Sequence, residues 1–218
     1  MDMITIALAK GRLADKALDL LEQMGIDCEE VRKDTRKLIF TARDGSVRFI
    51  MVKPSDVPAY VEYGTADIGI AGKDTLLEEG RPLYEMLDLK FGKCRLAVAG
   101  FENMNESSIS NSIIRVATKY PNIARKFFAD RGQSVEIIRL NGSVELGPLT
   151  GLSDVIVDIV ESGRTLKENG LVVLEEICPV SARLVVNQVS LKTKHDEIRR
   201  IIDSLKRLVE GKNDDSDN

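Results

Sequence analysis

The segment from Asp154 to Leu166 combines acidic side chains with a turn of small residues. It begins as an apolar run that contains Asp154 and Asp158, and it ends before a helix-like run. Backbone N–H groups that converge in a strand-to-helix turn suit a phosphate, as does the positive end of a helix. Carboxylates just upstream suit the hydroxyls of a ribose or a metal ion. The pattern indicates a site for a phosphorylated sugar, with a turn formed by Glu161, Ser162, Gly163, Arg164 and Thr165.

The same residues also have simpler explanations. A short Ser-Gly turn often does no more than connect a strand to a helix. Asp154 is ambiguous because an aspartate before an apolar run can simply begin the strand, and Arg164 either contacts a ligand phosphate or lies in solvent. The two carboxylates upstream of the turn favour the sugar-phosphate interpretation over the connector.

Two further turns place cations and glycine directly after predicted strands. Two cations beside a glycine at a helix start suit a polyphosphate, although solvated surface charges would give the same pattern. Neither turn has the spacing of a Walker loop, and no dinucleotide fingerprint is found. The residues concerned are Lys10, Gly11 and Arg12 in the first turn and Gly72, Lys73 and Asp74 in the second.

Two other charged positions are weaker indications. The run that begins at Lys53 contains Ser55 and Asp56, either of which can serve only as a helix cap. Arg183 lies within an apolar strand, so it either pairs internally or faces a ligand cleft, and we favour internal or interface pairing.

Composition restricts the class of protein. The 218 residues are 43% hydrophobic and 30% charged, which is ordinary for a globular protein, and the net charge is −4. An acidic chain argues against non-specific nucleic-acid binding. The apolar runs are too short for a membrane span, and no secretion signal is recognisable, so we expect a cytoplasmic protein. Three distant cysteines and a single histidine, His195, exclude a disulfide framework and a multi-histidine metal site.

Strand-like and helix-like segments alternate along the chain, in two successive sets. This alternation predicts an α/β fold with mostly parallel sheets and two lobes with a cleft between them, in which ligands bind beyond the carboxyl ends of strands. The tail 211–218 lacks apolar anchors and is predicted to be disordered. We expect strands at 4–9, 38–42, 47–52, 67–71, 95–100, 114–118, 135–140, 155–160, 171–175 and 182–191, and helices after 12, 54, 74, 122, 162 and 197.

Five stretches, in this order, resemble the ATP phosphoribosyltransferase family, which opens histidine biosynthesis. The resemblance extends from about Ile4 to Leu208 and is more specific than any single glycine turn. The stretches are Ala-Lys-Gly-Arg-Leu (9–13), the run 52–74 that begins Val-Lys-Pro-Ser-Asp, Ala-Thr-Lys-Tyr-Pro (117–121), the run 151–166, and Ser-Ala-Arg-Leu-Val-Val-Asn (181–187). One small departure is Gly147, where we expect a slightly larger residue such as Ala.

The resemblance implies a two-lobed fold similar to type II periplasmic binding proteins. Lobe I would comprise residues 1–90 and 179–210, and lobe II, which binds phosphoribosyl pyrophosphate (PRPP), residues 91–178. The family transfers phosphoribose from PRPP to N1 of the ATP adenine and releases pyrophosphate, with Mg²⁺ on the pyrophosphate. Because the chain ends soon after its last helix, it resembles the short form. It would then form a homodimer within a hetero-oligomer that contains a regulatory subunit resembling histidyl-tRNA synthetase.

The expected site follows from these two lines of reasoning. The amides of 162–165 would hold the 5′-phosphate of PRPP, and Asp154 and Asp158 would hold the ribose hydroxyls as the catalytic pair. The cations and glycines of turns 10–12 and 72–74 would contact ATP or pyrophosphate. Protein side chains alone would not bind the metal, which would be held through the substrate phosphates. Catalysis would rest on alignment and electrostatics.

Two other classes of protein compete with this expectation. A solute-binding protein or ligand sensor of the same fold would need an export signal or a DNA-binding segment, and neither is recognisable. A phosphoribosyltransferase for a free nucleobase usually has two adjacent acidic residues before its phosphate turn, whereas the acids here are spaced at 154, 158 and 161.

Overall fold

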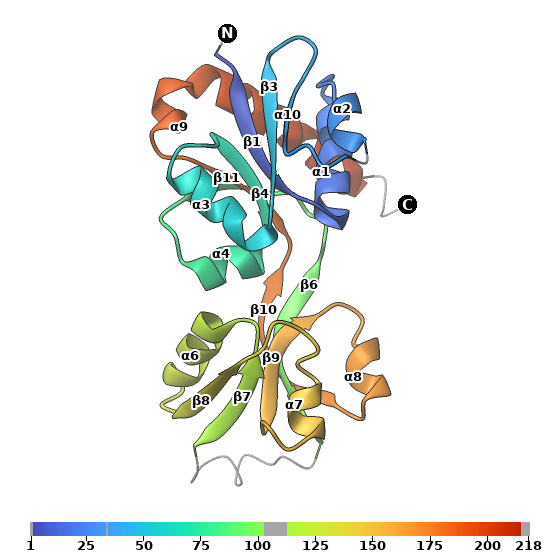
Figure 1. Cartoon of the computed structure of the whole chain (residues 1–218), viewed down its shortest axis with the longest axis vertical. Coiled ribbons are helices and arrows are strands. Elements are labelled where there is room, and N and C mark those ends of the chain that lie inside the picture. Colours follow the sequence, from blue (N-terminus) through green and yellow to red (C-terminus); the bar gives the residue numbers. More distant parts are fainter. Residues whose placement is uncertain (1, 34, 103–112, 215–218) are drawn as a thin grey trace. The chain divides into compact units, whose positions relative to one another are not determined.

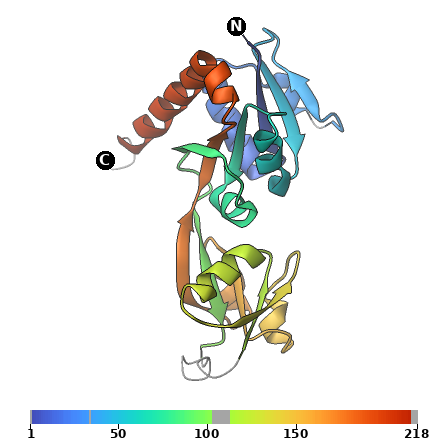
Figure 2. The same cartoon turned by 90° about the vertical axis from the view of Figure 1, so that its left-hand side faces the viewer.

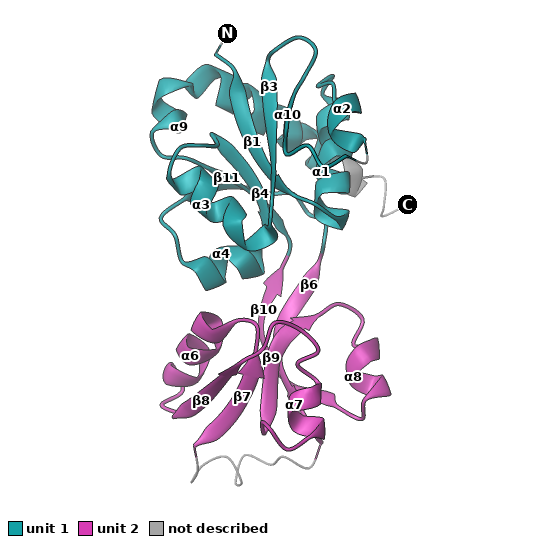
Figure 3. Cartoon of the chain, in the orientation of Figure 1, with its two compact units in different colours: residues 1–92, 181–218 teal, residues 93–180 magenta. Residues whose placement is uncertain are grey.

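The computed structural model describes residues 2–33, 35–102 and 113–214, and the side chains up to residue 211. The chain forms two compact units (Figure 3). Unit 1 combines Met1–Gly92 with Ser181–Asn218, and unit 2 is Lys93–Val180. The chain therefore leaves unit 1, builds the whole of unit 2 and then returns.

Unit 1 contains a six-stranded mixed sheet in the order β2-β3-β1-β4-β11-β5 (Figure 1). The neighbouring strands β3, β1 and β4 are parallel, while β2, β11 and β5 are antiparallel to their neighbours. Their bounds are β1 Ile4–Ala9, β2 Ile39–Thr41, β3 Val47–Val52, β4 Ile68–Gly72, β5 Tyr84–Asp88 and β11 Ala182–Val186.

Helices cover both faces of this sheet, because its central strands are apolar on both sides (Figure 1, Figure 2). Ile4, Ile6 and Leu8 of β1 join the core under α1 and α10, whereas Ala7 and Ala9 join the core under α3. The helices are α1 Arg12–Gln23, α2 Glu29–Arg32, η1 Pro54–Asp56, α3 Val57–Glu62, α4 Lys73–Glu79, α9 Ser190–Thr193 and α10 His195–Asp214.

A buried carboxylate fastens the returning segment to unit 1. Asp67 is 4% exposed and accepts hydrogen bonds from Thr5 N (2.8 Å), the Ser190 hydroxyl (2.6 Å) and Lys194 Nζ (2.8 Å). These donors come from β1 and from the segment after β11. Each oxygen of a charge removed from water is thereby satisfied, as a buried carboxylate requires.

Unit 2 contains a five-stranded mixed sheet in the order β10-β6-β9-β7-β8. Strands β9, β7 and β8 are parallel neighbours, and β6 runs antiparallel to both β9 and β10. The helices α6 and α8 lie on opposite faces (Figure 1). The bounds are β6 Cys94–Gly100, β7 Ile114–Thr118, α6 Pro121–Ala129, β8 Val135–Arg139, α7 Leu146–Leu149, β9 Val155–Val160, α8 Arg164–Glu168 and β10 Val172–Val180.

The structure corrects the predicted elements in five places. Both sheets are mixed and β5 was not predicted. The predicted strand 171–175 continues to Val180 as β10, and the predicted strand 182–191 stops at Val186. The strand ends because Asn187 Oδ1 accepts hydrogen bonds from the backbone N–H groups of Val189 (2.9 Å) and Ser190 (2.8 Å), which turns the chain into α9. Helix α10 continues to Asp214, so residues 211–214 are helical and not disordered. Residues 215–218 lie outside the described part of the chain.

Candidate active site

The parallel strands of unit 2 bring three turns to one edge of its sheet. Thr118 of β7 pairs with Val157 of β9 and with Arg139 of β8, so the three strands end side by side. We call this the unit 2 carboxyl edge, and it comprises the turns 161–163, 119–120 and 140–143. Ligands of open α/β sheets bind at such edges.

The turn after β9 has the conformation and the free donors that a phosphate needs. Gly163 has φ of 73°, a left-handed conformation that glycine adopts without strain. Among the described residues, no hydrogen-bond acceptor is found for the backbone N–H groups of Ser162, Gly163 and Thr165. Leu166 is 5% exposed and anchors the turn in the core, while the residues around it are exposed. Because α8 has only five residues, these amides count for more than its dipole.

Asp158 lies on the strand that leads into this turn. It is half-buried and directly opposite Ala97 of β6. Side chains alternate along a strand, so Asp158 shares a face with Ile156 and Val160, which belong to the core under α8. The Asp158 carboxylate therefore lies three residues before the turn that begins at Glu161, on the face that α8 covers.

The structure separates Asp154 from that turn, contrary to our prediction of a catalytic pair. Asp154 precedes the first residue of β9, so it lies at the opposite end of the strand from Ser162. Four residues of strand correspond to about 13 Å between Asp154 and Asp158. Because the two carboxylates are four residues apart along a strand, they lie on the same face of the sheet but at opposite ends of β9.

Asp154 instead forms an ion pair at the start of the strand. Arg115 donates to it from Nη2 (2.6 Å), Nε (3.3 Å) and the backbone N (2.8 Å). These side-chain hydrogen bonds from Arg115 lower the pKa of Asp154 below its ordinary value. Arg115 Nη1 also donates to the carbonyl of Gly151 (2.8 Å), so the pair fixes the segment that leads into β9.

Unit 1 has an equivalent edge, at which β3, β1 and β4 end. Ala9 pairs with Val52, and Leu8 pairs with Ile70, so the turns that follow these strands are neighbours. We call this the unit 1 carboxyl edge. Its charged residues are Lys10, Arg12, Lys53, Lys73 and Asp74. Sequence reasoning left Lys53 out of the site, although it follows a strand in the same way as Lys10.

The turns of unit 1 are preorganised by contacts of their own. Lys10 Nζ donates to the carbonyl of Thr35 (3.3 Å), and Lys73 Nζ pairs with Glu85 (2.5 Å). Gly11 precedes α1 with φ of 118°, which explains the glycine there. A Cβ at Gly72 would lie 2.2 Å from Asp74 Oδ1, because that side chain folds back over the glycine.

The contact with Thr35 shows that the turn before β2 also reaches this edge. The turn contains Arg36 and Lys37, which the sequence analysis did not select. Leu38 accepts a hydrogen bond from Met51 N near the end of β3 (2.8 Å), which fixes the turn beside the strand ends. No sequence spacing reveals this, because β2 runs antiparallel and therefore brings its start to the edge where β3 ends.

Arg183 confirms the preference for internal pairing. Its Nη1 lies 3.3 Å from Glu85 and 3.3 Å from Asp88. Ser181 donates to Asp88 as well (2.8 Å). Glu85 therefore connects Lys73 at the carboxyl edge to Arg183 within the sheet.

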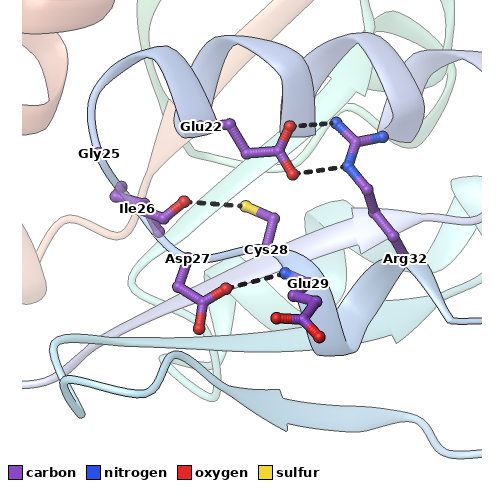
Figure 4. Close-up of a pocket in the computed structure, with 7 residues that line it drawn as sticks. All are labelled: Glu22, Gly25, Ile26, Asp27, Cys28, Glu29 and Arg32. Atoms are coloured by element: carbon purple, nitrogen blue, oxygen red, sulfur yellow. Dashed lines mark hydrogen bonds and ion pairs between the residues drawn. The ribbon is translucent and has the colours of Figure 1, made fainter.

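A cavity of about 420 Å³ lies elsewhere in unit 1, where α1 ends (Figure 4). It contains none of the predicted site residues. Arg32 crosses it to Glu22, with Nε 2.7 Å from Oε1. Burial raises the pKa of the Cys28 thiol to about 12, so this cysteine is an unreactive packing residue. The cavity is therefore not the predicted site.

Comparisons with known structures define the class of protein. The second periplasmic-type domain (VFT2) of BvgS from Bordetella pertussis shares the fold, with a TM-score of 0.57 and 11% identity over 93% of this chain and 86% of that one. The chain therefore has the two-lobed α/β fold of type II periplasmic binding proteins. Within that fold, the two units differ in the turns at their carboxyl edges, with open backbone amides in unit 2 and cations in unit 1.

Sequence comparisons identify the family. A model described as ATP phosphoribosyltransferase matches residues 53–207. Proteins of that name are 60% identical in Lachnospira eligens (96% of this chain, 98% of that protein) and 61% identical in Lachnoclostridium phytofermentans (96% and 98%). The Thermotoga maritima enzyme, solved as a HisG:HisZ complex, has a TM-score of 0.84 and 37% identity over 96% of this chain and 100% of that one.

The chain belongs to the ATP phosphoribosyltransferase family. Members of this family are transferases that move phosphoribose from PRPP to ATP in the first step of histidine biosynthesis. None of the described helices has the length and apolar character needed to cross a membrane.

Proposed function

We propose that the unit 2 carboxyl edge binds PRPP. The turn of Glu161, Ser162, Gly163, Arg164 and Thr165 holds the 5′-phosphate, and Asp158 accepts hydrogen bonds from the ribose hydroxyls. The observation that supports this most directly is the set of open N–H groups in the turn, next to the strand that carries Asp158. Asp154 is not included, because Arg115 occupies its carboxylate at the other end of β9.

The unit 1 carboxyl edge suits the polyphosphate of ATP or the departing pyrophosphate. Cations at the start of helices attract such anions, and the glycines let the backbone approach them. Lys73 is already paired with Glu85, so a phosphate oxygen would either replace that carboxylate or share the lysine with it. The residues we assign are Lys10, Gly11, Arg12, Gly72, Lys73 and Asp74, and the structure adds Lys53 as a candidate.

The reaction requires that the two substrates be aligned and that the charges of its transition state be stabilised. The lone pair of adenine N1 attacks C1 of the ribose, and the C1–oxygen bond to pyrophosphate breaks with its electron pair leaving on pyrophosphate. N1 carries no proton, so the attack itself needs no base. Asp158 stabilises the positive charge that develops on the ribose, and the cations stabilise the leaving group.

A divalent metal suits this family and this reaction, and we propose Mg²⁺. Phosphate oxygens are its preferred ligands, so it would be held chiefly by the substrates. No group of three or more acidic, cysteine or histidine side chains with metal-binding geometry is found within the described residues. The carboxylates present, Asp158 and Glu161, fit a supporting role near a substrate-bound ion. The ion would neutralise the pyrophosphate charge.

We further propose a regulatory partner and a cytoplasmic location. The Thermotoga maritima enzyme was solved in a HisG:HisZ complex, and this supports a hetero-oligomer. We propose that this chain forms a homodimer within it. Histidine control would then reside in the histidyl-tRNA-synthetase-like subunit. A biosynthetic enzyme with no helix suited to a membrane among its described residues belongs with the small-molecule substrates of the cytoplasm.

The test mixes purified chain with ATP, PRPP, Mg²⁺ and a pyrophosphatase, with and without the regulatory subunit. Ribosylation of N1 changes the adenine chromophore, so absorbance above the purine band should rise only when both substrates are present. Thr165→Ala should raise KM for PRPP more than KM for ATP. An effect on ATP alone would contradict the placement of the 5′-phosphate. Substitution of ATP by free adenine should give no product.

A further inference from the structure

The stretch Ala117–Pro121 has no role in the site proposed above, although it lies at the same edge. It comprises the last two residues of β7, the turn 119–120 and the first residue of α6, and β7 is the middle strand of the three that end there. On one side is the Glu161–Thr165 turn, and on the other is the turn after β8. Any ligand held over the end of β9 would lie within reach of it.

A buried hydroxyl fixes this turn to β9. Thr118 is fully buried, and its Oγ1 donates to the carbonyl of Val157 (2.6 Å) and accepts from the backbone N of Tyr120 (2.8 Å). One hydrogen bond crosses to the residue before Asp158, and the other spans the turn. The buried hydroxyl therefore acts both as a donor and as an acceptor. Leaving a buried donor or acceptor without a partner would cost free energy.

Lys119 lies between Thr118 and Tyr120, inside the turn that the second hydrogen bond closes. Because Thr118 pairs with Val157, the next residue along lies beside Asp158. Lys119 is the first residue after β7, two residues beyond Ala117, which shares the core under α8 with Ile156. Asp158 lies on the same face of the sheet as Ile156. Lys119 is exposed and has no ion-pair partner among the described residues.

We propose that Lys119 binds a phosphate group of the phosphoribosyl donor and that Thr118 is the positioning residue that holds it beside Asp158. The inference rests on the proposed PRPP site. The backbone amides of the turn supply dipoles but no full positive charge. Asp158 adds a negative charge to the same site. A lysine ammonium beside them supplies the charge that a dianionic phosphate needs. The phosphate is either the 5′-phosphate or the pyrophosphate at C1.

The first experiment compares Lys119→Gln, Lys119→Arg and the control Lys126→Gln, an exposed lysine on α6 of the same unit. Lys119→Gln should raise KM for PRPP by roughly tenfold to a hundredfold, as expected for one charge-assisted hydrogen bond, and leave KM for ATP within about twofold. Lys119→Arg should retain most of the affinity. An unchanged KM for PRPP in Lys119→Gln, or an equal loss in Lys126→Gln, would overturn the proposal.

Two probes then identify the phosphate. Ribose 5-phosphate and inorganic pyrophosphate are titrated into the same variants by calorimetry, with Mg²⁺ present. Weaker ribose 5-phosphate binding in Lys119→Gln assigns the lysine to the 5′-phosphate, and weaker pyrophosphate binding assigns it to the leaving group. If Lys119→Gln binds both probes as tightly as the wild type does, the proposal is contradicted.

The positioning role is tested by a double-mutant cycle. Thr118→Val keeps the shape of the side chain and removes both hydrogen bonds, whereas Thr118→Ser keeps the hydroxyl. Thr118→Val should raise KM for PRPP several-fold in the wild type but have little further effect in Lys119→Gln, because the two residues act together. Full additivity would show that Thr118 serves stability alone. Thr118→Ser should behave as the wild type.

The outcomes separate this inference from the proposed site. If Thr165→Ala weakens the binding of ribose 5-phosphate and Lys119→Gln weakens the binding of neither probe, the proposed PRPP site is supported and Lys119 has no role in it. If Lys119→Gln weakens the binding of a probe and Thr165→Ala weakens the binding of neither, the edge is the site and the Thr165 hydroxyl does not contact the phosphate. If the wild-type protein binds neither probe, both proposals fail.

Discussion

The two carboxyl edges have the same scaffold and different chemistry. In each unit, three neighbouring parallel strands end in turns that lead away from the sheet. The turns of unit 1 carry cations, of which Lys73 is paired in advance with Glu85. The β9 turn of unit 2 carries open backbone amides and follows a strand that contains Asp158. The scaffold therefore brings turns together, and the residues placed in them decide whether an edge suits a polyphosphate or a ribose phosphate.

The largest effect should come from exchanging the acids of β9. Asp158→Asn should lower kcat/KM for PRPP by roughly a hundredfold, because a neutral amide cannot stabilise the charge that develops on the ribose. Asp154→Asn should change kcat/KM less than about threefold, since its carboxylate lies at the other end of the strand. Steady-state kinetics of both variants provides the measurement. Equal losses would mean that the ends of β9 do not differ as described.

A second test concerns the packing of α7 against Ser153, just before β9 in unit 2. Gly147 of α7 faces Ser153, and an added Cβ would lie 2.3 Å from Ser153 Oγ and 2.9 Å from Ala117 Cβ. Gly147→Ala should therefore destabilise the protein by about 1–3 kcal/mol, the usual cost of overpacking. Adding Ser153→Ala should restore much of this, because Ser153 Oγ is buried and has no hydrogen-bond partner among the described residues. Urea unfolding of the single and double variants measures both changes.

The departure at Gly147 then has a physical reason. A Cβ at position 147 would lie too close to the Ser153 hydroxyl, which favours glycine there. If the double variant is no more stable than Gly147→Ala alone, the contact with Ala117 is the limiting one.

The ion pair between Asp154 and Arg115 should contribute to the stability of the fold and not to catalysis. Its folded pKa is lowered from 3.8, so the pair stabilises the folded state above that value and loses this contribution as the pH falls through the folded pKa. Asp154→Asn should lower Tm by about 2–4 °C at pH 7. The difference from the wild type should shrink below about pH 4. A constant difference from pH 7 to pH 3 would exclude this explanation.

The smallest effect is expected at the preformed pair of unit 1. Glu85→Gln releases Lys73, so KM for ATP or the inhibition constant of pyrophosphate should fall by about threefold, as for a partly exposed ion pair. Lys73→Gln should shift the same constant in the opposite direction. If Glu85→Gln weakens binding, Glu85 acts by positioning the lysine for its ligand.

Much of this organisation could be predicted from particular residues. Glycines and cations after apolar strands marked both edges, and Gly163 marked the turn after β9, where the structure shows that this glycine has a left-handed conformation. The end of β9 at which Asp154 lies was not predictable, because the strand boundary determines it and the apolar run continues past Asp158. Arg115 is distant in sequence, so no local pattern indicated its pairing with Asp154.

Other misses have the same origin in tertiary contacts. Among the strands that the structure describes, β5 pairs with β11 alone, which lies about a hundred residues later in the chain. Its Tyr84 and Met86 are exposed and show no buried pattern. Lys119 and Lys53 each follow a strand, so the rule that identified Lys10 would have found them if applied throughout. Arg36 and Lys37 could not be found in this way, since an antiparallel strand brings them to the edge.

The buried carboxylate of Asp67 has a consequence for the order of events during synthesis. Unit 2 is a continuous segment and can fold as soon as Val180 has emerged, whereas β4 and the core of unit 1 still lack β11, α9 and α10. Until Ser190 and Lys194 arrive, Asp67 lacks two of its three donors and the edge of β4 is open. The first part of the chain to be made is therefore the last to be completed, and a ribosome stalled just after Val180 has left its exit tunnel would display a finished unit 2 and an unfinished, aggregation-prone unit 1.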